Sequence, residues 1–292
     1  MFTRVLSLYN KKFSMVALLV AGNCATNRRI ATLMELPLVG CASHRYNLAV
    51  NRYLAAYEPE LAAVNSLMVQ LRHVNNAAEL AKYTDLKPIK RNVTRWWSTF
   101  EMMRRYKNIR DLIRQVDAVE EFIPTGATHK NLLELLEELK KLDSLCTRLQ
   151  GESVSMSDVR VLFDQVADDN RDMASHLRPC AKIVHCPVFT VVLLKIENNF
   201  KLTATEARSV QRFVVDPPAS SGKGKERSSS DNANEILGGG KQVRASGAAS
   251  ATYNDLAKVL PLTSNTVERL FSQCKFILTL QRSCMLSANF EM

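Results

Sequence analysis

The chain has 292 residues, of which 46% are apolar and 23% are charged. A chain of this length buries roughly three quarters of its unfolded surface, so it needs neither disulfides nor a structural metal to form a core. Its seven cysteines, an odd number without a repeating spacing, indicate reduced thiols in an intracellular protein. The 39 Lys and Arg against 29 Asp and Glu give a net charge of +10, which favours an anionic partner, nucleic acid before an anionic membrane.

No apolar run approaches the roughly 20 residues of a membrane-spanning helix, so we expect no membrane span. The longest early run, residues 15–22, follows Lys11 and Lys12 and superficially resembles the apolar part of a secretory signal. Turn-like residues follow it, and a short apolar run bounded by turn signals favours a buried strand. The signal peptide is the alternative.

The next segments predict a small α/β unit. Residues 24–34 read as a helix entered through Asn23, and residues 37–40 begin a second short apolar strand before His44. From Tyr46 onward the pattern changes to long amphipathic stretches, which predict helices. These stretches cover residues 48–71, 96–116, 131–149 and 156–174.

Apolar residues in the third stretch recur every three or four positions, which places them on one helical face. Because fewer than three full heptads are present, we expect this face to pack in a bundle core. A coiled-coil partner is the alternative. The face comprises Leu132, Leu135, Leu139, Leu142, Cys146 and Leu149.

Residues 216–250 are rich in Gly, Ser and Lys, a composition that cannot bury enough apolar surface to fold. We expect a flexible linker. Its Lys223, Lys225 and Arg227 are interpreted as solvated charges, although a localisation or DNA-contact patch is the other interpretation. The final block, residues 254–292, has a helical pattern that begins at the cap-like residues 263–265.

The positive charge is concentrated in two short windows. Residues 1–53 hold seven basic residues and one acid, and residues 87–114 hold nine basic residues and two acids. A basic window on a soluble chain is the expected footprint of nucleic acid. Both windows also contain distinctive motifs.

Three separated stretches carry these motifs. Residues 39–48 read VGCASHRYNL, with a Cys-x-x-His followed by Asn-Leu; residues 91–99 read RNVTRWWST; and residues 261–272 read PLTSNTVERLFS. Together, and in this order, they resemble the hAT superfamily of cut-and-paste DNA transposases and their domesticated relatives. The third stretch resembles the C-terminal dimerisation signature of that family.

The resemblance implies an α/β ribonuclease-H-like core, here partial, interrupted by a large all-α insertion, so that the chain is predominantly helical. It divides the chain into a partial core at 1–50, an all-helical insertion at 51–215, the linker at 216–250 and a dimerisation segment at 251–292 that completes the core. In the family, three carboxylates hold two Mg²⁺ ions, which clamp both ends of a phosphoryl displacement.

This sequence departs from the family pattern. Gly22 stands where the second acid belongs, and the first acid would lie upstream of residue 1. Only Glu268 matches the third acid. Glu35, the nearest other acid, lies across a helix from the strand end. We therefore expect no bound metal or other cofactor, no transposase activity and no small-molecule substrate, which makes the chain a pseudoenzyme.

Cys41 and His44 form the Cys-x-x-His pair, which we interpret as a packed thiol beside a hydrogen-bonded imidazole. A catalytic role for this pair would need a third group that activates the thiol, and the sequence offers none. Zinc binding together with Cys180, His185 and Cys186 is the other interpretation, although the spacing matches no common finger.

The resemblance assigns DNA contacts to the second basic window. In the family the Trp after Arg takes up a flipped base, which would be Trp96, and nearby cations contact phosphates. Those cations are Lys90, Arg91, Arg95, Arg104 and Arg105. The competing interpretation places Trp96, Phe100 and Met103 in a helical core stripe and gives Trp97 no role.

The sequence thus predicts a catalytically degenerate hAT-transposase-like protein of the nucleus, derived from a transposable element, with weak non-specific DNA binding. Dimerisation, or association with related chains, would use Val267, Leu270, Phe271 and Cys274. The alternative is an all-helical protein-interaction scaffold that uses the leucine face of residues 132–149 and has no nucleic-acid role.

Overall fold

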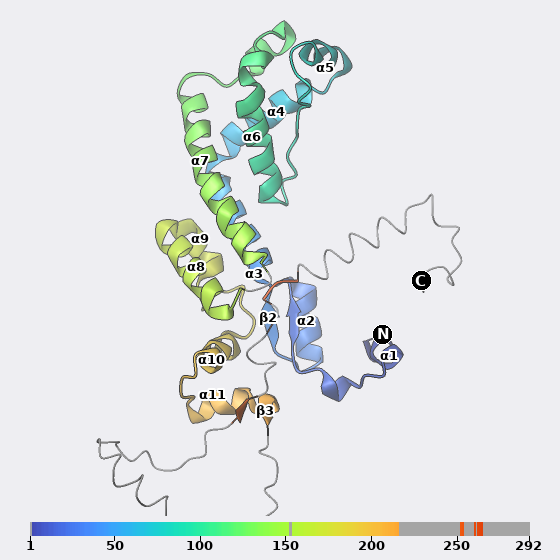
Figure 1. Ribbon diagram of the computed structural model, residues 1–292, viewed down its shortest axis with the longest axis vertical. Coiled ribbons are helices and arrows are strands. Elements are labelled where there is room, and N and C mark those ends of the chain that lie inside the picture. Colours follow the sequence, from blue (N-terminus) through green and yellow to red (C-terminus); the bar gives the residue numbers. More distant parts are fainter. Residues whose placement is uncertain (1, 152–153, 216–251, 254–259, 261, 265–292) are drawn as a thin grey trace, which may run out of the picture.

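The computed structural model describes residues 2–151, 154–215, 252–253, 260 and 262–264. The described chain is predominantly helical, and its strands form two small two-stranded sheets. The molecule is elongated, with a helical arm at one end and the small α/β unit near its middle (Figure 1). The N-terminal residues form α1 (Phe2–Leu8) and a 3-10 turn (Phe13–Met15).

The predicted strand–helix–strand unit is present. Strand β1 (Leu19–Ala21) pairs in parallel with β2 (Leu38–Gly40), and α2 (Ala25–Leu33) connects them. The first strand is shorter than the predicted run of residues 15–22, since Met15 belongs to the 3-10 turn and residues 16–18 and 22 are in neither the turn nor the strand. The helix also begins one residue later than predicted, with Cys24 rather than Asn23 as its N-cap.

The helical part follows directly after β2. Its helices are α3 (Ala42–Leu54), the 3-10 turn η2 (Ala55–Tyr57), α4 (Glu58–Gln70), α5 (Val74–Ala81), α6 (Trp96–Ile113), the 3-10 helix η3 (Asp117–Phe122), α7 (Gly126–Leu149), α8 (Met156–Asp169), α9 (Arg171–Leu177), α10 (Pro187–Glu197), α11 (Ala204–Ser209) and the 3-10 turn η4 (Gln211–Phe213).

Two of the predicted amphipathic stretches are each split into two helices. The stretch at 48–71 breaks at η2, before Pro59, because proline fits the first turn of a new helix but not a helix interior. The stretch at 156–174 breaks at Asn170, whose φ of −133° and ψ of 92° are extended. Helix α3 begins earlier than predicted, so that His44 lies in its first turn.

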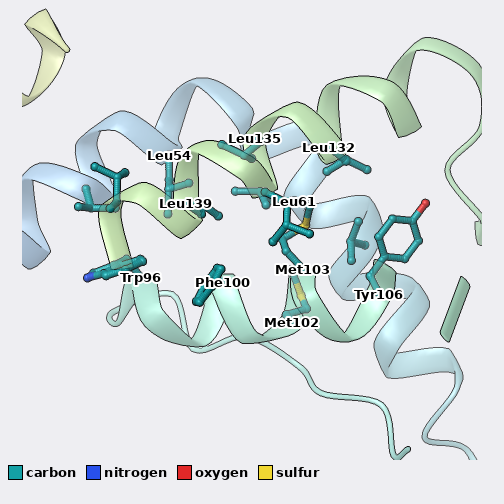
Figure 2. Packing of buried hydrophobic residues seen from close by; sticks show 14 of the residues in the cluster. Leu54, Leu61, Trp96, Phe100, Met102, Met103, Tyr106, Leu132, Leu135 and Leu139 are labelled. Carbon is teal, nitrogen blue, oxygen red and sulfur yellow. The ribbon is translucent and has the colours of Figure 1, made fainter. Parts of the chain in front are cut away.

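The main core lies between α3, α4, α6 and α7, and α8 and α9 pack beside it. Figure 2 shows Trp96 and Phe100 projecting from α6 into this core, near Leu54 and Leu139. The predicted leucine face of α7 is confirmed as core, since its five leucines are at most 5% exposed and Cys146 packs against them. No coiled-coil partner is needed to bury it.

A second core covers the small sheet. Val39 of β2 packs with apolar residues of α10 and η4, and Val20 of β1 is half-buried against the same cluster. Strand β3 (Val214–Val215) follows η4 and pairs antiparallel with β4 (Thr252–Tyr253). The segment predicted to be all-helical up to residue 215 therefore ends in a strand. The predicted linker lies outside the described residues.

Candidate functional site

Helix α3 begins where the Cys-x-x-His segment leaves the sheet, and it contacts the third motif. Cys41 is the N-cap of α3 and is fully buried. Its Sγ accepts hydrogen bonds from the backbone N–H and the Oγ of Ser264, both at 3.3 Å. The backbone N–H of Ala42 donates to the carbonyl of Leu262 at 2.8 Å, and the Leu262 side chain is buried. Residues more than 200 positions apart thus meet at the start of α3.

The same helix also contacts the second motif. The side-chain amides of Asn47 and Asn51 both donate to the carbonyl of Thr94, each at 3.3 Å. The ring of Tyr46, the residue before Asn47, meets the Trp96 ring edge-on, with 6.3 Å between the centroids and 78° between the planes. The second and third motifs therefore both contact the first motif, along α3 and at its start.

Gly22, at the predicted second-acid position, lies at the carboxyl end of β1 beside His44. A Cβ added at Gly22 would lie 3.4 Å from Cγ of the His44 ring. The carbonyl of Gly22 accepts a hydrogen bond from the side-chain amide of Asn27 at 2.8 Å. The Gly22 surroundings that the structure describes thus offer an imidazole and an amide rather than a carboxylate.

Asn23, next to Gly22, is buried with 8% of its surface exposed, and neither its Oδ1 nor its Nδ2 has a hydrogen-bond partner. The side chain lies against Gly40, where an added Cβ would be within 2.7 Å of three Asn23 side-chain atoms. Position 40 therefore accepts only glycine while Asn23 keeps this conformation.

This group of residues does not fit a two-metal centre, because hard Mg²⁺ ions require anionic oxygen ligands and none stands at position 22. Within the described part of the chain, no three His, Cys, Asp or Glu side chains gather into a metal-binding group. Glu268, the match to the third acid, lies outside the described residues, as do Val267, Leu270, Phe271 and Cys274.

The Arg-Trp-Trp block divides its two indoles between core and surface. Trp96 is 2% exposed and packs between Tyr46 and Phe100, whereas Trp97 is 54% exposed. The core-stripe interpretation of Trp96, Phe100 and Met103 is confirmed. In this structure the Trp96 ring offers no face to a base, and Trp97 is the aromatic that reaches solvent.

The five predicted DNA-contacting cations differ in availability. Arg91 forms a two-point ion pair with Glu58, and its side chain is 8% exposed. Arg104 pairs with Glu101 at 3.3 Å, and Arg105 donates to the carbonyl of Lys87 at 2.8 Å. Lys90 and Arg95 are exposed and form no ion pair with any described residue.

Arg45 belongs to the first basic window, but it faces inward rather than toward an anionic partner. Its guanidinium donates to the carbonyls of His176, Leu177 and Arg178 at 2.9–3.2 Å, which caps the C-terminal end of α9. Burial, with a smaller contribution from Arg160, lowers the Arg45 pKa to about 10. Sequence reasoning missed this role, because a cation in a helical pattern normally reads as surface.

Two further cations were not among the predicted DNA contacts, although Lys87 was counted in the second basic window. Lys87 is exposed on the extended segment before α6, beside the Arg105 guanidinium, and Arg72 donates to the carbonyl of Pro88 at 3.4 Å. Neither residue lies in a recognisable motif, so the structure is what connects them to the segment before α6.

No family model matches this chain, and no curated protein matches it either. Across the described ranges, no helix combines the length and the apolar character required to cross a membrane.

Proposed function

We propose that this chain is an hAT-transposase-like protein that has lost its catalytic centre and binds DNA weakly through the basic segment before α6. The observation that carries the proposal is the meeting of the three motifs on α3. Motifs that match a family only by chance have no reason to share contacts in the fold. Here Cys41, Asn47 and Tyr46, all from the first motif, contact Ser264, Thr94 and Trp96 of the other two.

The same architecture supports a partial ribonuclease-H-like core. A parallel β1–α2–β2 unit precedes the helical insertion, and residues 262–264 return to the start of α3 after it. The residues of this chain that would complete the core and form a dimer lie in the segment from Val267 to Cys274. Nuclear localisation follows from the same proposed family.

We propose that catalysis is lost because glycine stands at position 22. A carboxylate there would face the His44 ring at the end of β1, but glycine provides no metal ligand.

The DNA-binding surface is proposed to consist of Lys87, Lys90, Arg95 and the exposed indole of Trp97. This extended segment is held in place by Arg72, Asn65, Asn47 and Arg105, which all bond to its backbone. Cations on a fixed backbone contact phosphates without reading sequence, so binding is non-specific and salt-dependent. Arg91 is left out, because Glu58 already neutralises it.

The scaffold alternative loses its proposed surface. The leucine face of α7 is occupied by the protein's own core, so it is not available to a partner.

The test is fluorescence anisotropy with a labelled DNA duplex over a series of salt concentrations. Removing two phosphate contacts in Lys90→Glu/Arg95→Glu is expected to weaken binding strongly and to lower the salt slope by about 2. Lys182→Glu/Lys201→Glu changes two exposed cations that also form no ion pair with any described residue; it is the control and is expected to bind like the wild type. Equal binding by both double variants would contradict the proposed surface.

A further inference from the structure

A cavity of about 430 Å³ lies between α5 and the extended segment before α6, at the far end of the helical arm (Figure 1). Its volume falls in the range of about 300–1,000 Å³ that small-molecule sites occupy. The two buried residues of its lining, Leu80 and Pro88, are apolar, and so is the half-buried Ala77. A ligand with an apolar face can therefore pack inside it.

Three of the exposed residues that line this cavity are charged. They are Arg72, Asp85 and Lys87, and none of them forms an ion pair with a residue that the structure describes. One guanidinium N–H of Arg72 donates to the carbonyl of Pro88 at 3.4 Å, which holds the arginine at the cavity. A ligand there meets one carboxylate, which accepts hydrogen bonds, and two cations, which bind anionic oxygens.

Apolar walls, a carboxylate and two cations together match the chemistry of a nucleotide. The faces of a base pack against apolar side chains, while the edge of the base carries amino donors and carbonyl or ring-nitrogen acceptors. Asp85 can accept from an amino group, Arg72 can donate to a carbonyl, and Lys87 can neutralise a phosphate. A ligand with an apolar body and a single anionic group, such as a fatty acid, would leave Asp85 without a donor.

We propose that this cavity binds a nucleotide, with its base packed against Leu80 and its phosphate at Lys87. The nucleotide is supplied either free in solution or as an unpaired residue of a DNA strand. The second source rests on the proposed function, since Lys87 belongs to the proposed DNA-binding surface. A base that is paired in a duplex cannot enter a cavity without leaving the stack. Single-stranded DNA is therefore expected to bind more tightly than duplex at this site, and a base with an amino group more tightly than thymine, which has none.

The first measurement is fluorescence anisotropy of the full chain with labelled single-stranded oligo(dC) and with a duplex of the same length. Ala81→Trp places a bulky side chain in the cavity, and Ala78→Trp, at an exposed position of α5 that does not line the cavity, is the matched control. We expect Ala81→Trp to bind oligo(dC) at least about fivefold more weakly than the wild type, with unchanged duplex binding and circular dichroism. Ala78→Trp is expected to bind both like the wild type. Equal binding of oligo(dC) by the two variants would overturn the proposal.

Asp85→Ala tests recognition of the base without filling the cavity. The wild type is expected to prefer oligo(dC) to oligo(dT) by at least about fivefold, because cytosine has an amino group that donates to Asp85. Asp85→Ala is expected to abolish this preference, whereas Asp117→Ala, which removes another exposed carboxylate, is expected to keep it. A preference that survives in Asp85→Ala, or a wild type without one, would contradict the assigned contact.

NMR titration of the isotope-labelled wild type with dCMP separates the two sources. Shifts of the Leu80 and Ala81 amides at dCMP concentrations as low as those needed for oligo(dC) would identify a free nucleotide as the ligand. Shifts with oligo(dC) at much lower concentrations than with dCMP would identify an unpaired residue of DNA. If dCMP shifts these amides but no DNA binds, the proposed function fails and the cavity keeps its ligand. If neither ligand shifts them, this inference fails, even where the duplex still binds.

Discussion

The imidazole of His44 lies against the backbone of Gly22, so close that a Cβ at position 22 would be 3.4 Å from the His44 Cγ. Gly22 directly follows strand β1, and His44 occupies the first turn of α3, which starts two residues after β2 ends. The end of the parallel sheet therefore places this pair together, at the position where the proposed family has its second metal ligand.

Gly22→Asp tests the chemistry of this position. The new carboxylate would lie beside the His44 imidazole. Gly22→Asn, which adds a neutral side chain of the same shape, is the control. We expect no Mg²⁺-dependent nicking of DNA by either variant, because a single added acid does not make a two-metal site. Nicking by Gly22→Asp would contradict the proposed loss of catalysis.

Trp96 and Trp97 form a matched pair for a stability measurement. Truncating a buried aromatic typically costs about 3–5 kcal/mol of unfolding free energy, so Trp96→Ala is expected to be severely destabilised. Trp97→Ala is expected to stay within about 0.5 kcal/mol of the wild type, because its side chain is largely exposed. Urea denaturation measures both. Similar losses for the two variants would show that the assignment of core and surface is wrong.

Arg45 is expected to stabilise the contact between α3 and α9. Arg45→Met leaves three backbone carbonyls at the end of α9 without their donor, and one buried unsatisfied group alone costs about 1–3 kcal/mol. We expect a loss of at least about 2 kcal/mol. Arg52→Met, at an exposed position on the same helix, is the control and is expected to change stability by less than about 0.5 kcal/mol. Equal effects would contradict the capping role.

The lowered pKa values of two histidines lead us to expect that the protein is less stable in mild acid. Burial is the main factor that lowers the pKa of His129, and the charges of Arg110 and Arg114 lower it further. Burial also lowers the pKa of His176, with smaller contributions from the charges of Arg52 and Arg45. Below about pH 6.5 the unfolded chain therefore binds more protons than the folded chain, and the free energy of unfolding falls as the pH falls through the folded pKa values. Above that range this contribution is constant.

The measurement is the urea midpoint of unfolding between about pH 7.5 and pH 5. His129→Gln/His176→Gln is expected to lose less stability over this range than the wild type. An identical pH dependence in the two proteins would show that other groups are responsible.

The local patterns in the sequence were sufficient to predict the small strand–helix–strand unit and the longer helices, but not α5, α10, α11 or the second small sheet. Alternation of apolar runs and turn residues predicted β1, α2 and β2, and the spacing of Leu132, Leu135 and Leu139 predicted the buried face of α7. Such patterns work because the period of a helix or strand decides which residues share a face. They also predicted the basic window before α6, since net charge is read directly from composition.

Tertiary structure decided which members of those patterns are available to a partner. Adjacent indoles diverge because α6 turns Trp96 toward Tyr46 and leaves Trp97 outside, and adjacent cations diverge because α4 brings Glu58 to Arg91 but not to Lys90. Arg45 is buried because the C-terminal end of α9 packs against its guanidinium. The meeting of Cys41 with Ser264, and of Asn47 with Thr94, likewise depends on contacts between residues far apart in the chain, which no local period encodes.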